Sequence, residues 1–266
     1  MNTAIRSISD LDRIKKNRQS FEQKFHHQIL VCAGAGCVSS NCFEVRDAVI
    51  DHLRRLELDK EVRVFETGCM GTCAVGPVML ILPERIFYTK LTPDTAREII
   101  KAHLVDHKVP ERYTFYDHNL RRHVPVIDDI DFFRHQVRIA LRNCGAIEYG
   151  DVESYIAHDG YLAAAKVLSE MTPEQVVETV KASGLRGRGG AGFPTGVKWE
   201  AGSKAAGSVK YIVCNADEGD PGAFMDRSII EGDPHTVIEG MMIGGYAIGA
   251  TTGYIYVRAE YPIAVE

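Results

Sequence analysis

Between residues 28 and 108, hydrophobic residues recur at two spacings, and the order of these spacings predicts a small unit of strands and helices. Apolar or alternating runs predict strands at 28–31, 61–66, 78–82 and 85–89. The last two strands flank Pro83-Glu84 and are expected to form a hairpin. Helical spacing of apolar residues predicts helices at 43–58 and 93–104.

The rest of the chain predicts helices, then an α/β segment. Residues 1–27 are polar and predict a solvated helix or arm, and 109–130 predict a linker. Four helices are expected, at 131–145, 151–158, 161–170 and 172–183. Strands expected at 209–214 and 254–257 flank a helix at 235–250, which predicts an α/β sheet with a helical crossover. The predicted domains are therefore 28–108 and 131–266.

Composition excludes several classes of function. The chain has 266 residues, of which 45% are hydrophobic and 25% charged, which is the balance of a soluble protein of about two domains. Its net charge of −5 does not indicate the basic surface that nucleic-acid-binding proteins have. No apolar run reaches the ~20 residues of a membrane span, and the N-terminus lacks a signal-peptide core. We therefore expect the protein in the cytoplasm, where its seven cysteines are metal ligands or free thiols.

Four cysteines follow the first two predicted strands. Cys32 and Cys37 form C-x4-C after the first strand, and Cys69 and Cys73 form C-x3-C after the second. Both loops are rich in glycine, so the backbone can fold closely around an inorganic core. Four thiolates suit zinc or an iron–sulfur cluster. Structural zinc more often uses C-x2-C pairs, which favours the cluster.

Two further cysteines need separate interpretations. Cys42 lies close enough in sequence to replace Cys37 as a ligand, although it could equally be an ordinary residue at a helix start. Cys144 lies at the end of a predicted helix without ligand partners, which predicts a packing role. The histidines of 106–130 have no regular spacing and are expected to be solvated.

Residues 184–199 form a loop with six glycines, two arginines and a lysine. Glycine lets a ligand approach the backbone, and successive N–H groups in such a loop can surround an anion. Arg186, Arg188 and Lys198 add positive charge, while Phe193 and Trp199 supply flat apolar surface. The loop is therefore expected to hold a phosphorylated ring cofactor rather than to serve as a flexible linker.

The loop also contains G-x-G-x-x-G at Gly187, Gly189 and Gly192, the pattern of a Rossmann turn. That pattern should follow a strand, whereas the preceding residues predict a helix with Thr172 as N-cap and Gly184 at its C-terminal end. The loop is therefore predicted to follow a helix and not to form a Rossmann turn.

A polar loop follows the predicted strand 209–214. Ligands of open α/β sheets bind at the carboxyl ends of strands, so its side chains are candidates for contacts with cofactor hydroxyls and ring atoms. An ordinary acidic turn would explain them equally well without the neighbouring glycine loop. The candidates are Asn215, Asp217, Glu218 and Asp220.

Three ordered motifs resemble one known family. Residues 184–199, 214–227 and 254–261 are similar to the flavin-binding signatures of the FMN subunit of respiratory complex I. The same signatures occur in the flavin subunits of NAD-linked multimeric [FeFe] hydrogenases and formate dehydrogenases. The cysteine spacing and element order of 28–108 resemble the thioredoxin-like [2Fe–2S] ferredoxin domain. The fusion of the two leans towards the hydrogenase type.

The resemblance implies cofactors and the residues that bind them. One [2Fe–2S] cluster would be bound by Cys32, Cys37, Cys69 and Cys73. FMN and NAD(H) would be bound by Gly187, Arg188, Gly189, Gly190, Phe193, Lys198, Asn215, Asp217, Glu218, Asp220, Tyr256 and Glu260. Family members continue with a ubiquitin-like domain and a helical domain that holds a [4Fe–4S] cluster. The chain is therefore expected to be an N-terminal fragment with an incomplete FMN domain, inactive alone.

The expected function is that of the flavin subunit of an NADH dehydrogenase or NAD-dependent hydrogenase. NADH would give hydride to FMN, and the flavin would pass single electrons to clusters. The implied partners are a hydrogenase or formate dehydrogenase catalytic subunit and a small ferredoxin-like subunit, with no nucleic acid and no direct membrane span. The alternative is a non-catalytic [2Fe–2S] electron-transfer module.

The motif 258–261 reads Arg-Ala-Glu-Tyr where the family usually has Arg-Gly-Glu-Tyr. Its carboxylate, Glu260, is expected to accept hydrogen bonds from an adenosine ribose and to repel a 2′-phosphate. Two like charges ~4 Å apart repel by about 4 kcal/mol at an effective dielectric of 20. We therefore expect a preference for NADH over NADPH.

Overall fold

The computed structural model describes residues 5–266, which divide into two compact units. The cysteine unit consists of 16–155 and 231–233. The loop unit consists of the other described residues, 5–15, 156–230 and 234–266. Each unit is described by itself. Within residues 5–266, no helix combines the length and the apolarity that crossing a lipid bilayer requires.

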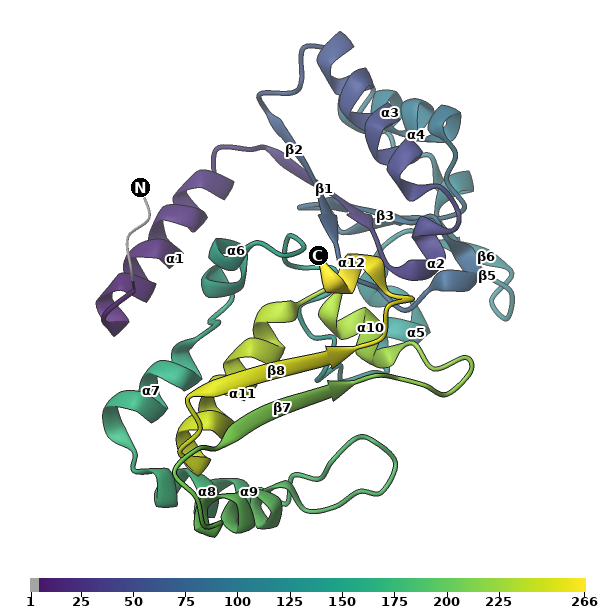
Figure 1. Cartoon of the computed structure of the whole chain (residues 1–266). Coiled ribbons are helices and arrows are strands. Elements are labelled where there is room, and N and C mark those ends of the chain that lie inside the picture. The colour runs from purple at the N-terminus through teal and green to yellow at the C-terminus, as the bar shows by residue number, and fades with distance from the viewer. Residues whose placement is uncertain (1–4) are drawn as a thin grey trace. The chain divides into compact units, whose positions relative to one another are not determined.

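The cysteine unit is built on a four-stranded sheet in the order β2-β1-β3-β4 (Figure 1). β1 pairs with β2 in parallel and with β3 in antiparallel, and β3 pairs with β4 in antiparallel. The first parallel pair brings the carboxyl ends of β1 and β2 together, which the sequence predicted. The strands are β1 (His27–Cys32), β2 (Val62–Thr67), β3 (Met79–Leu82) and β4 (Ile86–Tyr88).

Two helices, α3 (Cys42–Arg55) and α4 (Pro93–Ile100), pack against each other in this unit. Thr92 caps α4, because its side chain accepts a hydrogen bond from the Thr95 N–H. The predicted helix 93–104 does not continue as α-helix to its end, since a π-helix, η2 (Lys101–Val105), follows α4. This wider turn lies where the His103 ring hydrogen-bonds the buried Tyr88 hydroxyl at 2.9 Å.

The expected linker 109–130 packs onto the sheet. It contains the hairpin of β5 (Phe115–Asp117) and β6 (Arg122–Val124), and the single helical turns η3 (Glu111–Tyr113) and η4 (Ile127–Asp129). β-bridges join Tyr88 to Thr114 and Ile86 to Val126. Val124, Ile127 and Ile130 are buried in the main core. These apolar positions are too widely spaced for sequence periodicity to show them.

The predicted helix 131–145 is largely wrong. Only α5 (Asp131–Arg134) is helical, and the chain then proceeds through turns. Val137 is 89% exposed and Ile139 is 74% exposed, so the apolar positions do not share a buried face that could stabilise a longer helix. Cys144 and Ile147 are buried instead, within the turns.

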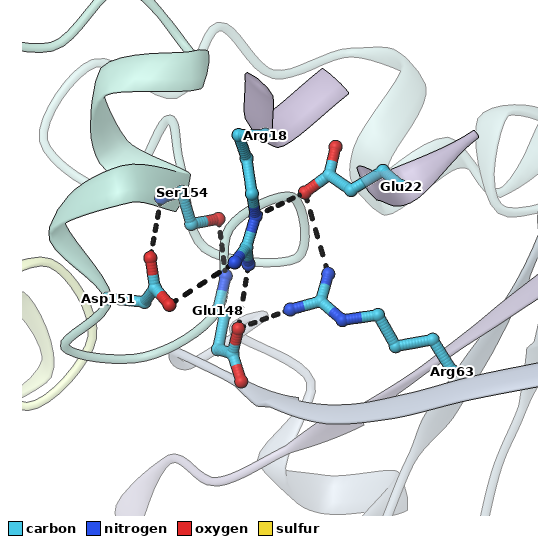
Figure 2. A network of polar contacts seen from close by, with 6 residues as sticks. All are labelled: Arg18, Glu22, Arg63, Glu148, Asp151 and Ser154. Atoms are coloured by element: carbon cyan, nitrogen blue, oxygen red, sulfur yellow. Dashed lines mark hydrogen bonds and ion pairs between the residues drawn. The ribbon is translucent and has the colours of Figure 1, made fainter. Parts of the chain in front are cut away.

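An ion-pair network joins the end of α1 (Ile8–Glu22) to the sheet and to residues 148–151, all within the cysteine unit (Figure 2). Arg18 pairs with Glu22 at 2.8 Å, with Glu148 at 2.7 Å and with Asp151 at 3.4 Å. Arg63 of β2 also pairs with Glu148. The side chains of Arg18 and Arg63 are 7% and 10% exposed, so both charges depend on these partners.

The loop unit contains a two-stranded parallel sheet whose strands are joined by a helix, as predicted (Figure 1). The strands are β7 (Tyr211–Ala216) and β8 (Thr252–Val257), and the crossover helix is α11 (Pro234–Ile248). The other helices are α7 (Leu162–Glu170), α8 (Pro173–Ala182), α9 (Thr195–Lys204), α10 (Met225–Ile230) and α12 (Pro262–Val265). A further helix, α6 (Val152–Ala157), begins in the cysteine unit and ends in this one.

A small core holds the loop unit together. Val176 and Val177 of α8 and Val167 of α7 pack with Ala247 of α11. Gly196 of α9 lies so close to α8 that a Cβ there would meet the Lys181 backbone N at 2.6 Å. The glycine loop is therefore anchored at both ends by helices in contact.

Candidate functional sites

Four cysteines converge at the carboxyl ends of β1 and β2. Cys32 is the last residue of β1 and stands opposite Thr67, the last residue of β2. Cys37 lies in the short helix α2 (Ala35–Val38), and Cys73 begins the single turn η1 (Cys73–Val75). The structure therefore brings all four predicted ligands to one edge of the sheet.

The four thiols influence one another. Cys37 and Cys69 both act on the pKa of Cys32, and Cys32 and Cys73 both act on the pKa of Cys69. Cys32, Cys37 and Cys69 are buried, whereas Cys73 is exposed. The sulfur atoms are thus close together, and one of them is at the surface.

Glycines keep the space around the sulfur atoms open. A Cβ on Gly34 would be 2.9 Å from the Cys69 Sγ, and one on Gly36 would be 3.0 Å from the Cys73 Sγ. The first distance is shorter than side chains tolerate, and the second is tighter than nearly all Cβ contacts. These two glycines of the first loop therefore let it approach the cysteines of the second.

This set of thiols fits an iron–sulfur cluster. The hydrogen bond with Cys37 raises the pKa of Cys32 to about 12, and the hydrogen bond with Cys32 also raises the pKa of Cys69. Such thiols deprotonate together only when a cation compensates their charge. Within residues 5–266, no three potential ligands surround one metal ion. A [2Fe–2S] cluster takes four thiolates shared between two irons, and the four cysteines at this edge of the sheet supply that number.

The contacts favour Cys37 over Cys42 as the fourth ligand. Cys42 is the first residue of α3 and is fully buried in the core, and burial raises its pKa to about 12. Cys32 acts on the pKa of Cys42 only through its charge, whereas Cys37 has the largest influence on the pKa of Cys32.

The glycine loop leaves α8, as predicted, and leads into α9, which the sequence did not predict. Lys198 and Trp199, expected in the loop, therefore lie in this helix. Gly184 has φ of +68°, which ends α8 in a left-handed residue. The Gly187 N–H donates to the Phe193 carbonyl at 2.9 Å, and the Thr195 N–H donates to the Leu185 carbonyl at 2.9 Å. These bonds close the base of the loop and leave its tip free.

The tip of the loop has room for a ligand. A Cβ on Gly189 or Gly190 would meet no atom within 4 Å. Arg188, Phe193 and Lys198 are exposed. The residues present therefore fit a cofactor that brings phosphate and an aromatic ring to the backbone, because open space, cationic charge and apolar surface occur together.

The strand-end candidates meet at the carboxyl ends of β7 and β8. Asn215 stands opposite Tyr256 in the register of the two strands, and the Asp217 N–H donates to the Asn215 side chain at 3.2 Å. Asp220 is exposed in the turn before α10. In Figure 1 the strand ends and the loop between α8 and α9 point to the same side of the unit.

Glu218 is held by the protein itself. Its carboxylate accepts the N–H groups of Asp226 and Arg227 at 2.7 and 3.1 Å, at the start of α10, and the Tyr261 hydroxyl at 3.1 Å. Its φ is +48°, an uncommon value for a residue other than glycine. The side chain therefore shapes the loop between β7 and α10.

Glu260 has a cation beside it that the sequence argument did not consider. The Arg258 guanidinium donates to both carboxylate oxygens of Glu260 at 3.2 Å and lowers the pKa of that carboxyl. Arg258 also donates to the Glu218 carbonyl at 3.1 Å. Sequence reasoning placed Arg258 at this strand end without a role and missed the contacts of Tyr261, although both belong to the motif 258–261.

The geometry defines a chain with a four-thiol site on one unit and a glycine-rich anion loop on the other. Family models match both parts. Residues 18–104 match the thioredoxin-like [2Fe–2S] ferredoxin, and residues 180–266 match the Nuo51 FMN-binding domain. The chain therefore combines a thioredoxin-like [2Fe–2S] ferredoxin domain with a Nuo51-type FMN-binding domain. The predicted fold class is confirmed, and so are FMN and [2Fe–2S] as the cofactors of the two families.

Three relatives show the range of similar proteins. The HndC component of the NADP-reducing hydrogenase of Solidesulfovibrio fructosivorans is 62% identical over 49% of this chain and 26% of its own length. An NADH-quinone oxidoreductase component of Rhizobium meliloti is 54% identical over 48% of this chain and 30% of its own. The alpha component of the NAD-reducing hydrogenase HoxS of Cupriavidus necator is 37% identical over 74% of this chain and 30% of its own. The chain thus spans less than a third of the length of each.

Proposed function

We propose that the chain acts in the flavin-containing subunit of an NADH-linked oxidoreductase complex of the hydrogenase type. The observation that carries the proposal is that each unit has a candidate site of its own, and that the segment around each site matches the corresponding cofactor family. When bound, FMN exchanges hydride with a nicotinamide and single electrons with iron–sulfur clusters. The partners would be the other subunits of a multi-subunit redox complex.

The chain's own residues would bind and orient the cofactors. Gly189 and Gly190 would let the flavin approach the backbone, and Arg188 and Lys198 would neutralise its phosphate. Phe193 would offer apolar surface beside the ring. At the strand ends, the Asn215 amide would donate to or accept from cofactor polar atoms, and the carboxylates of Asp217 and Asp220 would accept from them. Glu218 would hold that loop in place.

The relatives' names differ in the coenzyme that they mention. The hydrogenase of HndC is called NADP-reducing, whereas HoxS is called NAD-reducing. We propose NADH for this chain because Glu260 would oppose a 2′-phosphate. Arg258 partly neutralises Glu260, so we expect the preference to be weaker than the carboxylate alone would produce.

A second candidate function is a [2Fe–2S] electron-transfer module without flavin chemistry. One observation favours it: all four candidate ligands lie within the cysteine unit, so this site does not depend on the glycine loop.

The visible spectrum of the purified chain, with its iron, sulfide and flavin content, separates the two functions. We expect cluster bands together with flavin bands. Cluster bands without flavin would favour the second function. Flavin bands without cluster bands would support the FMN part of the first function and refute the cluster site. A colourless chain would refute both functions.

A further inference from the structure

Three residues that follow α10 in sequence belong to the cysteine unit. Glu231 and Asp233 are 6% and 2% exposed, and Gly232 between them is also buried. Gly232 lies against Gly68, the residue directly before the candidate ligand Cys69. A Cβ on Gly68 would be 2.6 Å from the Gly232 Cα and 2.6 Å from the Cys144 Sγ. Only a glycine at position 68 allows these segments to pack so closely.

A second segment, 143–149, lies along the end of β2 beside the same loop. The Gly145 N–H donates to the Thr67 hydroxyl at 2.8 Å, and the Tyr149 N–H donates to the Glu66 carbonyl at 3.0 Å. A Cβ on Gly145 would be 3.1 Å from the tip of Met70, the residue after Cys69. The residues on both sides of Cys69 are therefore covered by protein.

One buried hydrogen bond joins the two covering segments. The Asn143 side-chain amide donates to the Asp233 carboxylate at 2.7 Å, and the two residues are 7% and 2% exposed. An amide–carboxylate bond between buried groups is a strong constraint, because both have already lost their water and removing either leaves the other without this bond. Asn143 and Asp233 thus close a clasp over the Cys69 side of the thiol site.

We propose that this clasp sets the reduction potential of the cluster, with Asn143 and Asp233 as positioning residues. The inference rests on the proposed [2Fe–2S] site. Reduction adds one electron, and therefore one negative charge, to the cluster. A buried carboxylate opposes that charge, and the exclusion of water strengthens the opposition. The clasp thus lowers the potential and also shields the cluster from solvent on this side.

The test is an EPR-monitored redox titration of the full chain with dithionite. Asp233→Asn keeps the shape of the side chain and removes its charge. We expect the equilibrium constant for reduction to rise roughly tenfold, which for one electron is a shift of about 59 mV to higher potential. Exchanging the two residues, Asn143→Asp with Asp233→Asn, restores charge and hydrogen bond and should return the potential towards that of the unmodified chain. The control Asp94→Asn removes a carboxylate whose side chain is 91% exposed and should cause no shift.

A purely structural role would lower the melting temperature of Asp233→Asn and leave the potential unchanged, which would overturn the proposal. Should that variant fail to fold, Asn143→Ala opens the clasp while keeping the charge. We then expect a higher potential and faster loss of iron to a chelator, and no change in either would also overturn the proposal. Absence of the cluster from the unmodified chain would instead refute the proposed cluster site itself.

Discussion

At the residue scale, the partner of a carboxylate changes what that carboxylate can do to a coenzyme. Glu260 without a partner would repel a 2′-phosphate, because like charges a few ångströms apart oppose each other. The bidentate pairing with Arg258 and the 66% exposure of the Glu260 side chain reduce this repulsion. We expect it to approach the weak repulsion of two charges in water.

Glu260→Gln should therefore narrow the preference for NADH over NADPH by only about fivefold, mainly through better use of NADPH. The measurement is kcat/KM for both coenzymes in the complete complex with either residue. Glu260→Gln also frees the Arg258 side chain, so Arg258→Gln serves as the matched control. That control should increase the ratio of kcat/KM for NADH to kcat/KM for NADPH. An unchanged ratio in both variants would make this pair irrelevant to coenzyme choice.

The cysteines allow a second prediction at this scale. Serine is a poorer ligand than a thiolate, so replacing Cys32, Cys37, Cys69 or Cys73 with Ser should remove or alter the EPR signal of the reduced cluster. Cys42→Ser should leave the signal in place, because Cys42 is buried in the core at the start of α3. A lost signal in Cys42→Ser together with an intact one in Cys37→Ser would transfer the ligand role to Cys42.

At the element scale, the glycine loop is positioned by helices and left open by its own backbone. Gly189 has no neighbour that a side chain would meet, and its φ lies outside the left-handed region, so the fold itself tolerates a larger residue there. Loss of cofactor in a variant at this position would therefore report on the ligand's space rather than on misfolding.

We expect Gly189→Val to abolish FMN retention in the assembled protein while its melting temperature without FMN changes little. The readout is flavin content after gel filtration. Gly240→Val is a suitable control, because a side chain at that exposed helical position also meets open space and lies away from the loop. Stoichiometric FMN in the Gly189 variant would show that the ligand does not approach this residue.

At the scale of the whole molecule, the cysteine unit depends on buried charges as well as on its apolar core. Arg63 lies 4.4 Å from the centre of the Phe65 ring and shares Glu148 with Arg18. Removing Arg63 leaves two partly buried carboxylates, Glu22 and Glu148, with Arg18 as their shared cation.

Arg63→Met should therefore lower the free energy of unfolding of the cysteine unit by about 3 kcal/mol, although methionine preserves the apolar stem. Chemical denaturation followed by circular dichroism measures the loss. Arg54→Met removes an exposed pair with Asp51, whose side chains are 65% and 62% exposed, and should cost no more than about 0.5 kcal/mol. Equal effects of the two variants would contradict a special role for the buried network.

The sequence by itself determined the elements whose signals are local. Thr172 and Pro173 predicted the start of α8, and Gly184 its end, because capping and a left-handed residue depend on neighbours a few positions away. The cysteine spacing and the two parallel strands predicted that four thiols would meet. The resemblance of three motifs was sufficient to indicate the family, because a motif is also a local pattern.

Only the tertiary structure decided features that depend on distant residues. Glu218 shapes a loop because Tyr261 and the start of α10 reach its carboxylate. Residues 131–145 fail to form the predicted helix because no core faces Val137 and Ile139. Asn143 and Asp233 are 90 positions apart, yet they share a buried hydrogen bond. Burial and long-range pairing are properties of the folded chain. The periodic pattern of hydrophobic residues does not specify which distant segment will supply a residue's partner.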